Sequence, residues 1–204
     1  GDNSNLQCGT GAASGTLPPG EIFQGDLVDA VAAGANHDCV LLTANGLPSV
    51  RCVGRPFTNN AVLGAVLLSD VRSLSSGGGF SCAVKLDGTA YCWGTNGAGQ
   101  LGGATTSNAP QQVAALSGAV QISAGGQHAC VLLGTGALSC WGSNVRGQLG
   151  DGTSDGGATP TTPMLTGVTR VSAGGSHTCA LRDGGAWCWG NNEFGQLGVD
   201  AGLG

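Results

Sequence analysis

The stretch from Gly174 to Gly198 reads GGSHTCALRDGGAWCWGNNEFGQLG and is the clearest copy of a repeated unit. Two further copies lie upstream, GGQHACVLLGTGALSCWGSNVRGQLG over residues 125–150 and GGFSCAVKLDGTAYCWGTNGAGQLG over residues 78–102. A divergent copy, AGANHDCVLLTANGLPSVRCVG, covers residues 33–54. The chain is therefore built from repeats.

The length of the repeat and its composition indicate the fold class. Gln100, Gln148 and Gln196, in the closing Gly-Gln-Leu-Gly, recur 48 residues apart. A period between 20 and 50 residues is typical of solenoids, propellers and arrays, because one small unit cannot bury its own apolar face. Short apolar runs alternate with Gly-rich turns, and helical periodicity is missing. The sequence therefore predicts an all-β repeat protein.

The two cysteines of the last copy are predicted to lie opposite each other in a hairpin. Cys179 and Cys188 flank Asp183-Gly184, a dipeptide typical of two-residue hairpin turns. Counting outward from this turn sets Leu181 opposite Ala186 and Cys179 opposite Cys188. Opposed residues of antiparallel strands lie roughly 4.5 to 5.5 Å apart at Cα, which a disulfide can span.

The other three copies keep their cysteines opposed around turns of different length. We expect a three-residue loop Leu86-Asp87-Gly88 with Gly88 in the left-handed conformation, a turn over Gly134-Thr135-Gly136, and a longer loop around Asn45-Gly46 that includes Pro48. The CxxC spacing of structural zinc sites is absent, which favours disulfides over metal binding. The predicted pairs are Cys39–Cys52, Cys82–Cys92, Cys130–Cys140 and Cys179–Cys188.

Histidines also recur, two residues before the first cysteine of three copies. These are His37, His128 and His177, while Phe80 takes the same place in the remaining copy. Recurrent histidines could indicate metal ligands or bases, but the phenylalanine indicates that the position requires a ring-shaped side chain. We therefore predict a structural role for a ring that fills space and can also form a hydrogen bond.

The Cys-Trp-Gly and Gly-Gln-Leu-Gly motifs are also predicted to be structural. Trp93, Trp141 and Trp189 each follow a cysteine, and neighbouring strand residues point to opposite faces of a sheet. The disulfide is then expected on one face and the indole on the other. The closing motif predicts a tight turn in which the glycines permit positive φ and the glutamine amide satisfies backbone groups.

Charge and cysteine content restrict the classes of function. The formal net charge is −5, with Lys85 as the single lysine, which disfavours nucleic-acid binding. No apolar run of about 18 residues is present, so no membrane span is expected in this segment. Paired cysteines indicate an oxidising compartment, and we predict a secreted or cell-surface protein. No cofactor site, metal site or catalytic constellation is predicted.

The two ends of the chain suggest that it is a segment of a longer array of repeats. Residues 1–9 share the frame of the closing motif, with Cys8 in the place of its leucine. Cys8 is the odd cysteine and is expected to be free or bridged to an external partner. We interpret residues 1–27 as the end of a preceding repeat plus a linker. Residues 28–204 would then hold four repeats, at about 28–70, 71–117, 118–167 and 168–204.

The segments between repeats are rich in Thr, Ser and Pro. Loops on a stiff scaffold often carry binding, and such compositions are also typical of O-linked glycosylation. No Asn-x-Ser/Thr sequon occurs in the chain. The expected O-glycan positions are Thr105, Thr106, Thr159, Thr161 and Thr162.

With the segments SAGGSHTCAL and WCWGNNEFGQLG, the chain resembles the regulator of chromosome condensation repeat family. The resemblance extends from about Val28 to Gly198. The resemblance implies a β-propeller or partial propeller. About four blades would be present, each with a disulfide-stapled hairpin. The cysteine-bearing variant is similar to the ectodomain repeats of plant crinkly-type receptor kinases. The founder of the family is a nucleotide-exchange factor on chromatin, a role that the acidity, the disulfides and the lack of basic tails disfavour.

Our leading hypothesis is a non-catalytic extracellular interaction or structural module within a larger assembly. Its partner would be a protein, either a further copy or a ligand, with glycan a second option. The alternative is a receptor ectodomain or a protein inhibitor that uses the loops between repeats. A bacterial propeller inhibitor of β-lactamases shares the architecture that the resemblance implies and serves as a binding surface. An enzyme would need convergent groups, whereas the three histidines occupy equivalent positions in different repeats.

Overall fold

The computed structural model describes residues 2–4, 14–16, 27–44, 47–55, 67–103, 105–114, 116–161 and 165–200. In these ranges the chain forms strands and turns without a helix, so the predicted all-β class is confirmed. A short antiparallel pair, β1 (Asp2–Asn3) and β2 (Ser14–Thr16), precedes the repeats. Cys8 and Thr162 lie outside the described residues.

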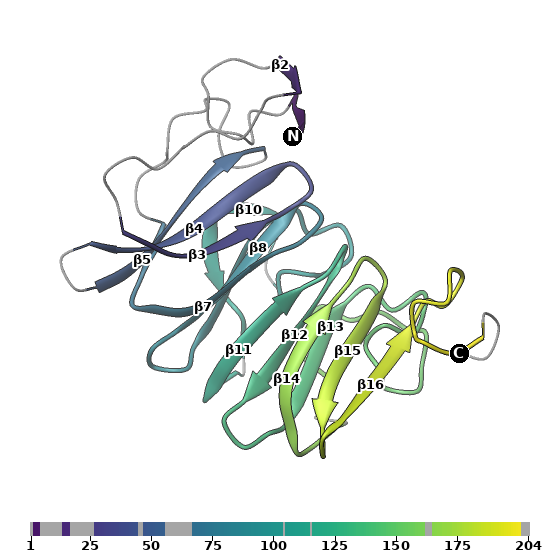
Figure 1. Ribbon diagram of the computed structural model, residues 1–204. Helices are drawn as coiled ribbons and strands as arrows, with labels where there is room; N and C mark the ends of the chain where they lie inside the picture. Colours follow the sequence, from purple (N-terminus) through teal and green to yellow (C-terminus); the bar gives the residue numbers. More distant parts are fainter. Residues whose placement is uncertain are drawn as a thin grey trace.

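The repeats form four antiparallel sheets that we call blades 1 to 4, in chain order (Figure 1). Blade 1 contains β3 (Val28–Ala33), β4 (His37–Ala44), β5 (Leu47–Gly54) and β6 (Leu68–Ser69). Blade 2 contains β7 (Val71–Ser76), β8 (Phe80–Lys85), β9 (Ala90–Gly94) and β10 (Ser107–Gln112). Blade 3 contains β11 (Ala119–Ala124), β12 (His128–Leu133) and β13 (Leu138–Gly142), and blade 4 contains β14 (Val168–Ala173), β15 (His177–Arg182) and β16 (Gly185–Gly190).

Within each blade, consecutive strands lie side by side, and the first strands of successive blades contact one another (Figure 1). These first strands, β3, β7, β11 and β14, are the inner strands. The blades thus follow one another in a row, as in a propeller, with blade 1 at one end and blade 4 at the other.

The register of each hairpin follows from its turn. Between β15 and β16, Leu181 faces Ala186 and Cys179 faces Cys188, which is the predicted register. The turn residues Asp183 and Gly184 have φ of 52° and 77°, as a two-residue hairpin turn requires. In all four blades the opposed cysteines are joined by a disulfide, with Cα atoms 4.1 Å apart. Each blade therefore contains a hairpin whose two strands are joined by a disulfide.

The prediction that Pro48 lies in a long loop is wrong. Pro48 belongs to β5 and faces Thr43, and pairing continues to Ala44 and Leu47, so only two residues separate the strands. On its other side, β5 pairs with β6 only from Ser49 onward. Proline is tolerated at such an edge position, because no neighbouring strand requires its missing N–H.

The apolar core lies between the blades. The disulfide of one blade packs in a cluster with the tryptophan of the next. Trp93 packs with Cys39 and Cys52, Trp141 with Cys82 and Cys92, and Trp189 with Cys130 and Cys140. As predicted from strand alternation, a blade therefore carries its disulfide on one face and its indole on the other.

Removing one buried disulfide tests its share of stability. We expect Cys130→Ala with Cys140→Ala to lower the free energy of unfolding by roughly 2–4 kcal/mol, measured in guanidinium chloride. The matched control is Cys179→Ala with Cys188→Ala. This disulfide closes a loop of nearly the same length, with a sequence separation of nine residues against ten, but its cysteines are only half-buried. Its loss should be smaller. Equal stability of all three proteins would contradict this account.

Candidate functional site

The closing Gly-Gln-Leu-Gly turn holds the tryptophan of the following blade. The indole N–H of Trp141 donates to the backbone carbonyl of Gln100 at 2.9 Å, and that of Trp189 donates to the carbonyl of Gln148 at 3.0 Å. Trp93 is also fully buried, but its indole nitrogen has no hydrogen-bond partner among the described residues. The repeat before Trp93 lacks a Gly-Gln-Leu-Gly sequence, the motif that supplies this carbonyl in the other copies.

The turn itself is fixed by two side chains. The Gln148 side-chain carbonyl accepts the N–H of Arg146 at 2.9 Å, and Asn144 accepts the N–H of Leu149 at 2.9 Å. The same two bonds recur in the other complete copies, made by Gln100 and Asn96 and by Gln196 and Asn192. Because these bonds lie within the turn, they fix the position of the glutamine backbone carbonyl that accepts the indole N–H.

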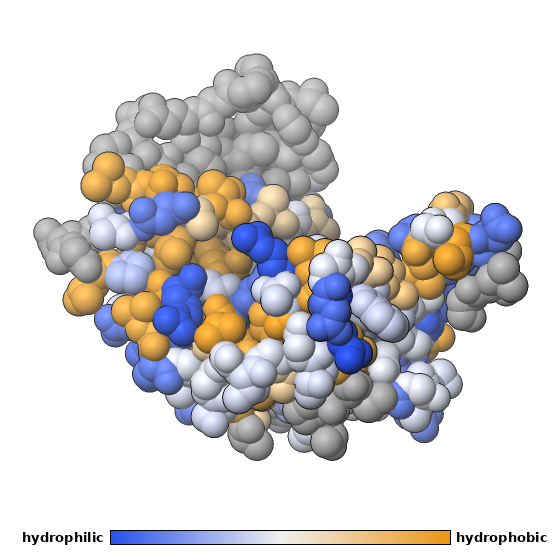
Figure 2. All heavy atoms as spheres, turned by 60° about the horizontal axis from the view of Figure 1, so that its bottom comes forward, coloured by the Kyte–Doolittle hydropathy of each residue, from blue (hydrophilic) through white to orange (hydrophobic). Residues whose placement is uncertain are grey.

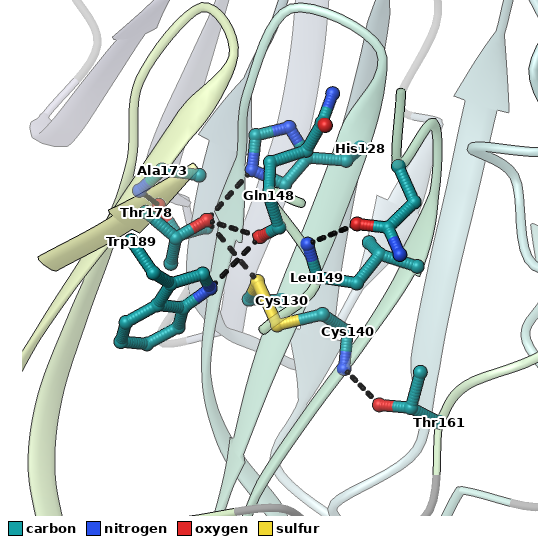
Figure 3. The surroundings of a disulfide bond; sticks show 11 residues. His128, Cys130, Cys140, Gln148, Leu149, Thr161, Ala173, Thr178 and Trp189 are labelled. Atoms are coloured by element: carbon teal, nitrogen blue, oxygen red, sulfur yellow. Dashed lines mark hydrogen bonds between the residues drawn. A yellow bond between two sulfur atoms is a disulfide. The ribbon is translucent and has the colours of Figure 1, made fainter. Parts of the chain in front are cut away.

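A second contact joins the histidine of one blade to a hydroxyl of the next (Figure 3). His128 Nε2 lies 2.8 Å from Thr178 Oγ1, and Thr178 donates its hydroxyl proton to the carbonyl of Gln148 at 2.9 Å. Thr178 therefore accepts a hydrogen bond from His128, whose proton is on Nε2. His37 Nε2 lies 2.8 Å from Ser81 Oγ in the same way.

The histidines are placed for structure and do not converge. Burial lowers the pKa of His37 and of His128 to about 4, so both rings are neutral near pH 7. Each lies in a different interface between blades, and His177 lies half-buried on the outer face of blade 4. Among the described residues, no three His, Cys, Asp or Glu side chains are grouped to hold a metal ion.

Glycines at the ends of the inner strands allow the blades to approach closely. A Cβ atom on Gly77 would lie 2.1 Å from the carbonyl oxygen of Gly125, and one on Gly126 would lie 2.5 Å from that of Gly175. The backbone also bonds across this line, with the N–H of Gly78 donating to the carbonyl of Gly125 at 3.1 Å. Sequence reasoning missed this role, although the recurrent Gly-Gly pairs were a visible signal.

Side chains of the inner strands add bonds that the sequence did not reveal. Ser75 accepts the N–H of Ala124 at 2.9 Å, and Ser123 accepts the N–H of Ala173 at 2.8 Å. The Gln121 amide bonds both the N–H and the carbonyl of Val171. Side chains of β7 therefore hold the backbone of β11, and side chains of β11 hold the backbone of β14.

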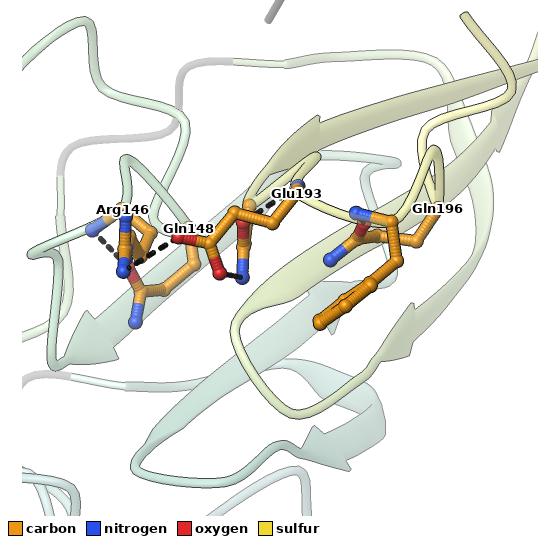
Figure 4. Close-up of polar contacts among 6 residues, drawn as sticks. Arg146, Gln148, Glu193 and Gln196 are labelled. Atoms are coloured by element: carbon orange, nitrogen blue, oxygen red, sulfur yellow. Dashed lines mark hydrogen bonds and ion pairs between the residues drawn. The ribbon is translucent and has the colours of Figure 1, made fainter. Parts of the chain in front are cut away.

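The residues just before each Gly-Gln-Leu-Gly motif, which we call the closing-turn tips, carry exposed polar and apolar side chains. Arg146 of blade 3 pairs with Glu193 of blade 4, with 3.0 Å between Nη2 and Oε1 (Figure 4). Val145 is 73% exposed and Phe194 is 90% exposed. These tips therefore present both charged and apolar groups to solvent.

The threonines expected to carry glycans differ in exposure. Thr105, Thr106 and Thr159 are exposed. Thr161 is half-buried, and its hydroxyl accepts the N–H of Cys140 at 3.1 Å. In the described part of the chain, no helix is long and apolar enough to cross a membrane.

Comparison with known families gives one consistent result. The regulator of chromosome condensation (RCC1) repeat matches residues 87–132 and 135–181, and a second form of the same repeat matches residues 71–100, 119–148 and 168–196. Together the matches extend over more than half of the chain. None of the curated protein sequences is significantly similar to it.

Solved structures support the same fold. Human WBSCR16 is 27% identical with a TM-score of 0.78, over 97% of this chain and 57% of that one. Yeast RCC1 (Prp20), solved with Kap60, is 21% identical with a TM-score of 0.72, over 87% and 47%. The entire ectodomain of the receptor kinase CR4 from Physcomitrella patens is 29% identical with a TM-score of 0.57, over 89% and 44%. This chain thus spans about half the length of each of these three structures.

The bond from Trp141 to Gln100 gives a direct test of the interface. We expect Trp141→Phe to lower the free energy of unfolding by about 2 kcal/mol, because a buried carbonyl loses its donor. Trp187→Phe is the matched control, since Trp187 is 51% exposed and its change should stay within about 0.5 kcal/mol. Equal losses for the two variants, measured by denaturant unfolding, would refute this role.

The buried histidines predict a loss of stability in acid. Their pKa is about 4 in the folded protein against an ordinary 6.5, so the unfolded chain binds more protons between these values. Stability should be complete above pH 6.5 and should fall as pH decreases toward 4, by up to about 3 kcal/mol per histidine. The double variant His128→Phe with Thr178→Ala, which copies the native Phe80 and Ala129, should flatten this dependence. An unchanged slope would disprove the assignment.

Proposed function

This chain belongs to the regulator of chromosome condensation (RCC1) repeat family, and from that premise we propose that it is a non-catalytic extracellular module for interaction or assembly. The single observation that carries the proposal is the set of four disulfides, one in every blade. The cysteines of the first three blades are at most 1% exposed. Their bridges belong to the cores that join the blades.

The disulfides support an oxidising compartment. Disulfides persist in secreted proteins and on cell surfaces and are rare in the cytosol. A chain that depends on them in each repeat is suited to the outside of the cell. We therefore propose a secreted or cell-surface location, in which exposed Thr105, Thr106 and Thr159 are accessible for O-linked glycans.

The three histidines do not converge on one site, which supports a non-catalytic role. The polar groups of the described interfaces bond to one another: His128 to Thr178, and Thr178 to the carbonyl of Gln148. The single lysine, Lys85, lies 3.8 Å from Asp70, and the net charge of −5 gives no basic face for nucleic acid. The interface groups of the described residues thus serve to join the blades, and the exposed surface is what the chain offers to a protein partner.

A receptor ectodomain or a protein inhibitor is the second candidate. The moss CR4 structure is a receptor-kinase ectodomain and is 29% identical to this chain. The exposed Phe194 and Val145, beside the pair of Arg146 and Glu193, form a mixed apolar and charged surface of the kind that binds proteins. In this role, the closing-turn tips would contact the ligand.

The redox state of the native chain tests the proposal. The chain is produced through a secretory pathway and alkylated before and after reduction, and its intact mass is measured. We expect eight cysteines to be protected until reduction. The same material should not accelerate nucleotide release from a small GTPase. Nine reactive thiols in the unreduced native protein, or exchange activity, would refute the proposed function.

A further inference from the structure

The residue just before the second cysteine of each disulfide occupies the same position in every blade. In blades 1, 2 and 4 this residue has a large side chain: Arg51, Tyr91 and Trp187. In blade 3 it is Ser139, which faces Val131 as Trp187 faces Ala180. Blade 3 therefore lacks the large side chain that the three other blades carry at this position.

A cavity lies where that side chain is missing. It has a volume of about 270 Å³, and Ser139 lines it together with Leu133 of blade 3 and Leu116, which follows β10 of blade 2. Ser139 shares one face of β13 with Trp141, and the ring of Trp141 packs with the disulfide of blade 2. The cavity therefore belongs to the interface between blades 2 and 3, inside the row of blades.

Blade 4 shows how the same position holds an aromatic ring. Arg182 has the strand position that Leu133 has in blade 3, and its Cζ lies over the Trp187 ring, 5.5 Å from the centroid. A ring that entered the cavity of blade 3 would accordingly pack against Leu133. Apolar cavities of about 150 Å³ hold benzene. A cavity of about 270 Å³ therefore has room for the fused rings of an indole.

The cavity combines apolar walls with a hydroxyl group that has no partner. The apolar walls come from Ala114, Leu116, Leu133 and Pro160. Ser139 is 3% exposed, and its hydroxyl forms no hydrogen bond with another described residue. Such a hydroxyl can accept the N–H of an indole or the O–H of a phenol. The lining therefore matches an aromatic ring that carries one polar group.

The cavity can be reached from outside the molecule. Thr159 contributes to its lining and is exposed. Figure 2 shows apolar and hydrophilic residues interspersed over the face of the molecule that it presents. On mixed surfaces of this kind, an aromatic side chain inserted into a pocket contributes a large share of the binding energy of a protein complex.

We infer that this cavity binds a tryptophan or tyrosine side chain of a protein partner, whose ring takes the position that Tyr91 and Trp187 fill in their own blades. This inference rests on the proposed function as an interaction module and names the chemistry that the partner presents. The ring packs against Leu116 and Leu133, and its N–H or O–H donates to the hydroxyl of Ser139.

A substitution that fills the cavity tests the inference. Ser139→Tyr places in blade 3 the residue that blade 2 has at this position, Tyr91. The oxidised chain is made without O-linked glycans, so that Thr159 is unmodified, and is titrated with the capped peptide Gly-Gly-Trp-Gly-Gly and with free indole. We expect the wild type to bind both probes saturably, with dissociation constants of about 1 mM or below. Ser139→Tyr should bind them about tenfold more weakly or not at all.

The location of binding is measured by nuclear magnetic resonance on the wild-type chain. The methyl signals of Leu116 and Leu133, which line the cavity, should shift as either probe is added. This measurement needs no substitution, so it decides the location even if Ser139→Tyr fails to fold. Circular dichroism and protection of eight cysteines verify the fold of each variant.

Leu47→Tyr is the matched control, because Leu47 is exposed on blade 1 and receives the same side chain outside the cavity, so binding should stay unchanged. The peptide Gly-Gly-Ala-Gly-Gly should not bind. Failure of both probes to bind the wild type, binding that Ser139→Tyr leaves unchanged, or shifts away from Leu116 and Leu133 would overturn the inference. Binding of indole without binding of the tryptophan peptide would overturn the assignment to a protein side chain. Any of these results, in a chain with eight protected cysteines, would still leave the proposed function standing.

Discussion

In blades 3 and 4, the indole packs on the disulfide of the preceding blade, and its N–H donates to the backbone carbonyl of that blade's closing turn. Trp141 shows the complete arrangement, packed with Cys82 and Cys92 and bonded to Gln100. A single blade has too little apolar surface to be stable alone, so its two faces must be covered by neighbours. The structure therefore depends on contacts between blades more than on contacts within them.

This dependence explains how the polar residues are used. His128, Thr178 and the carbonyl of Gln148 bond to one another in a buried interface, so these groups hold the blades together. Function is left to exposed surfaces such as the closing-turn tips, where Val145 and Phe194 are exposed. A scaffold of repeated, stapled units that presents such surfaces is well suited to binding proteins.

Local features of the sequence were sufficient for the hairpins, since the two-residue strand period and the turn at Asp183-Gly184 fix the register. The error at Pro48 arose because proline usually marks a loop, whereas its position in β5 is at an edge. The bonds between blades were not predictable. His128 and Thr178 are 50 residues apart, and nothing in either repeat shows which residue of the other it meets until the blades are placed.

Exchange of the tryptophan indole protons, followed by nuclear magnetic resonance, tests the central claim most directly. If the indoles of Trp141 and Trp189 are bonded parts of their interfaces, their N–H protons should exchange slowly, and that of half-exposed Trp187 should exchange rapidly. Buried Trp93, whose indole nitrogen has no partner among the described residues, separates the effect of burial from that of the hydrogen bond. Equally fast exchange at Trp141 and Trp187 would contradict the account.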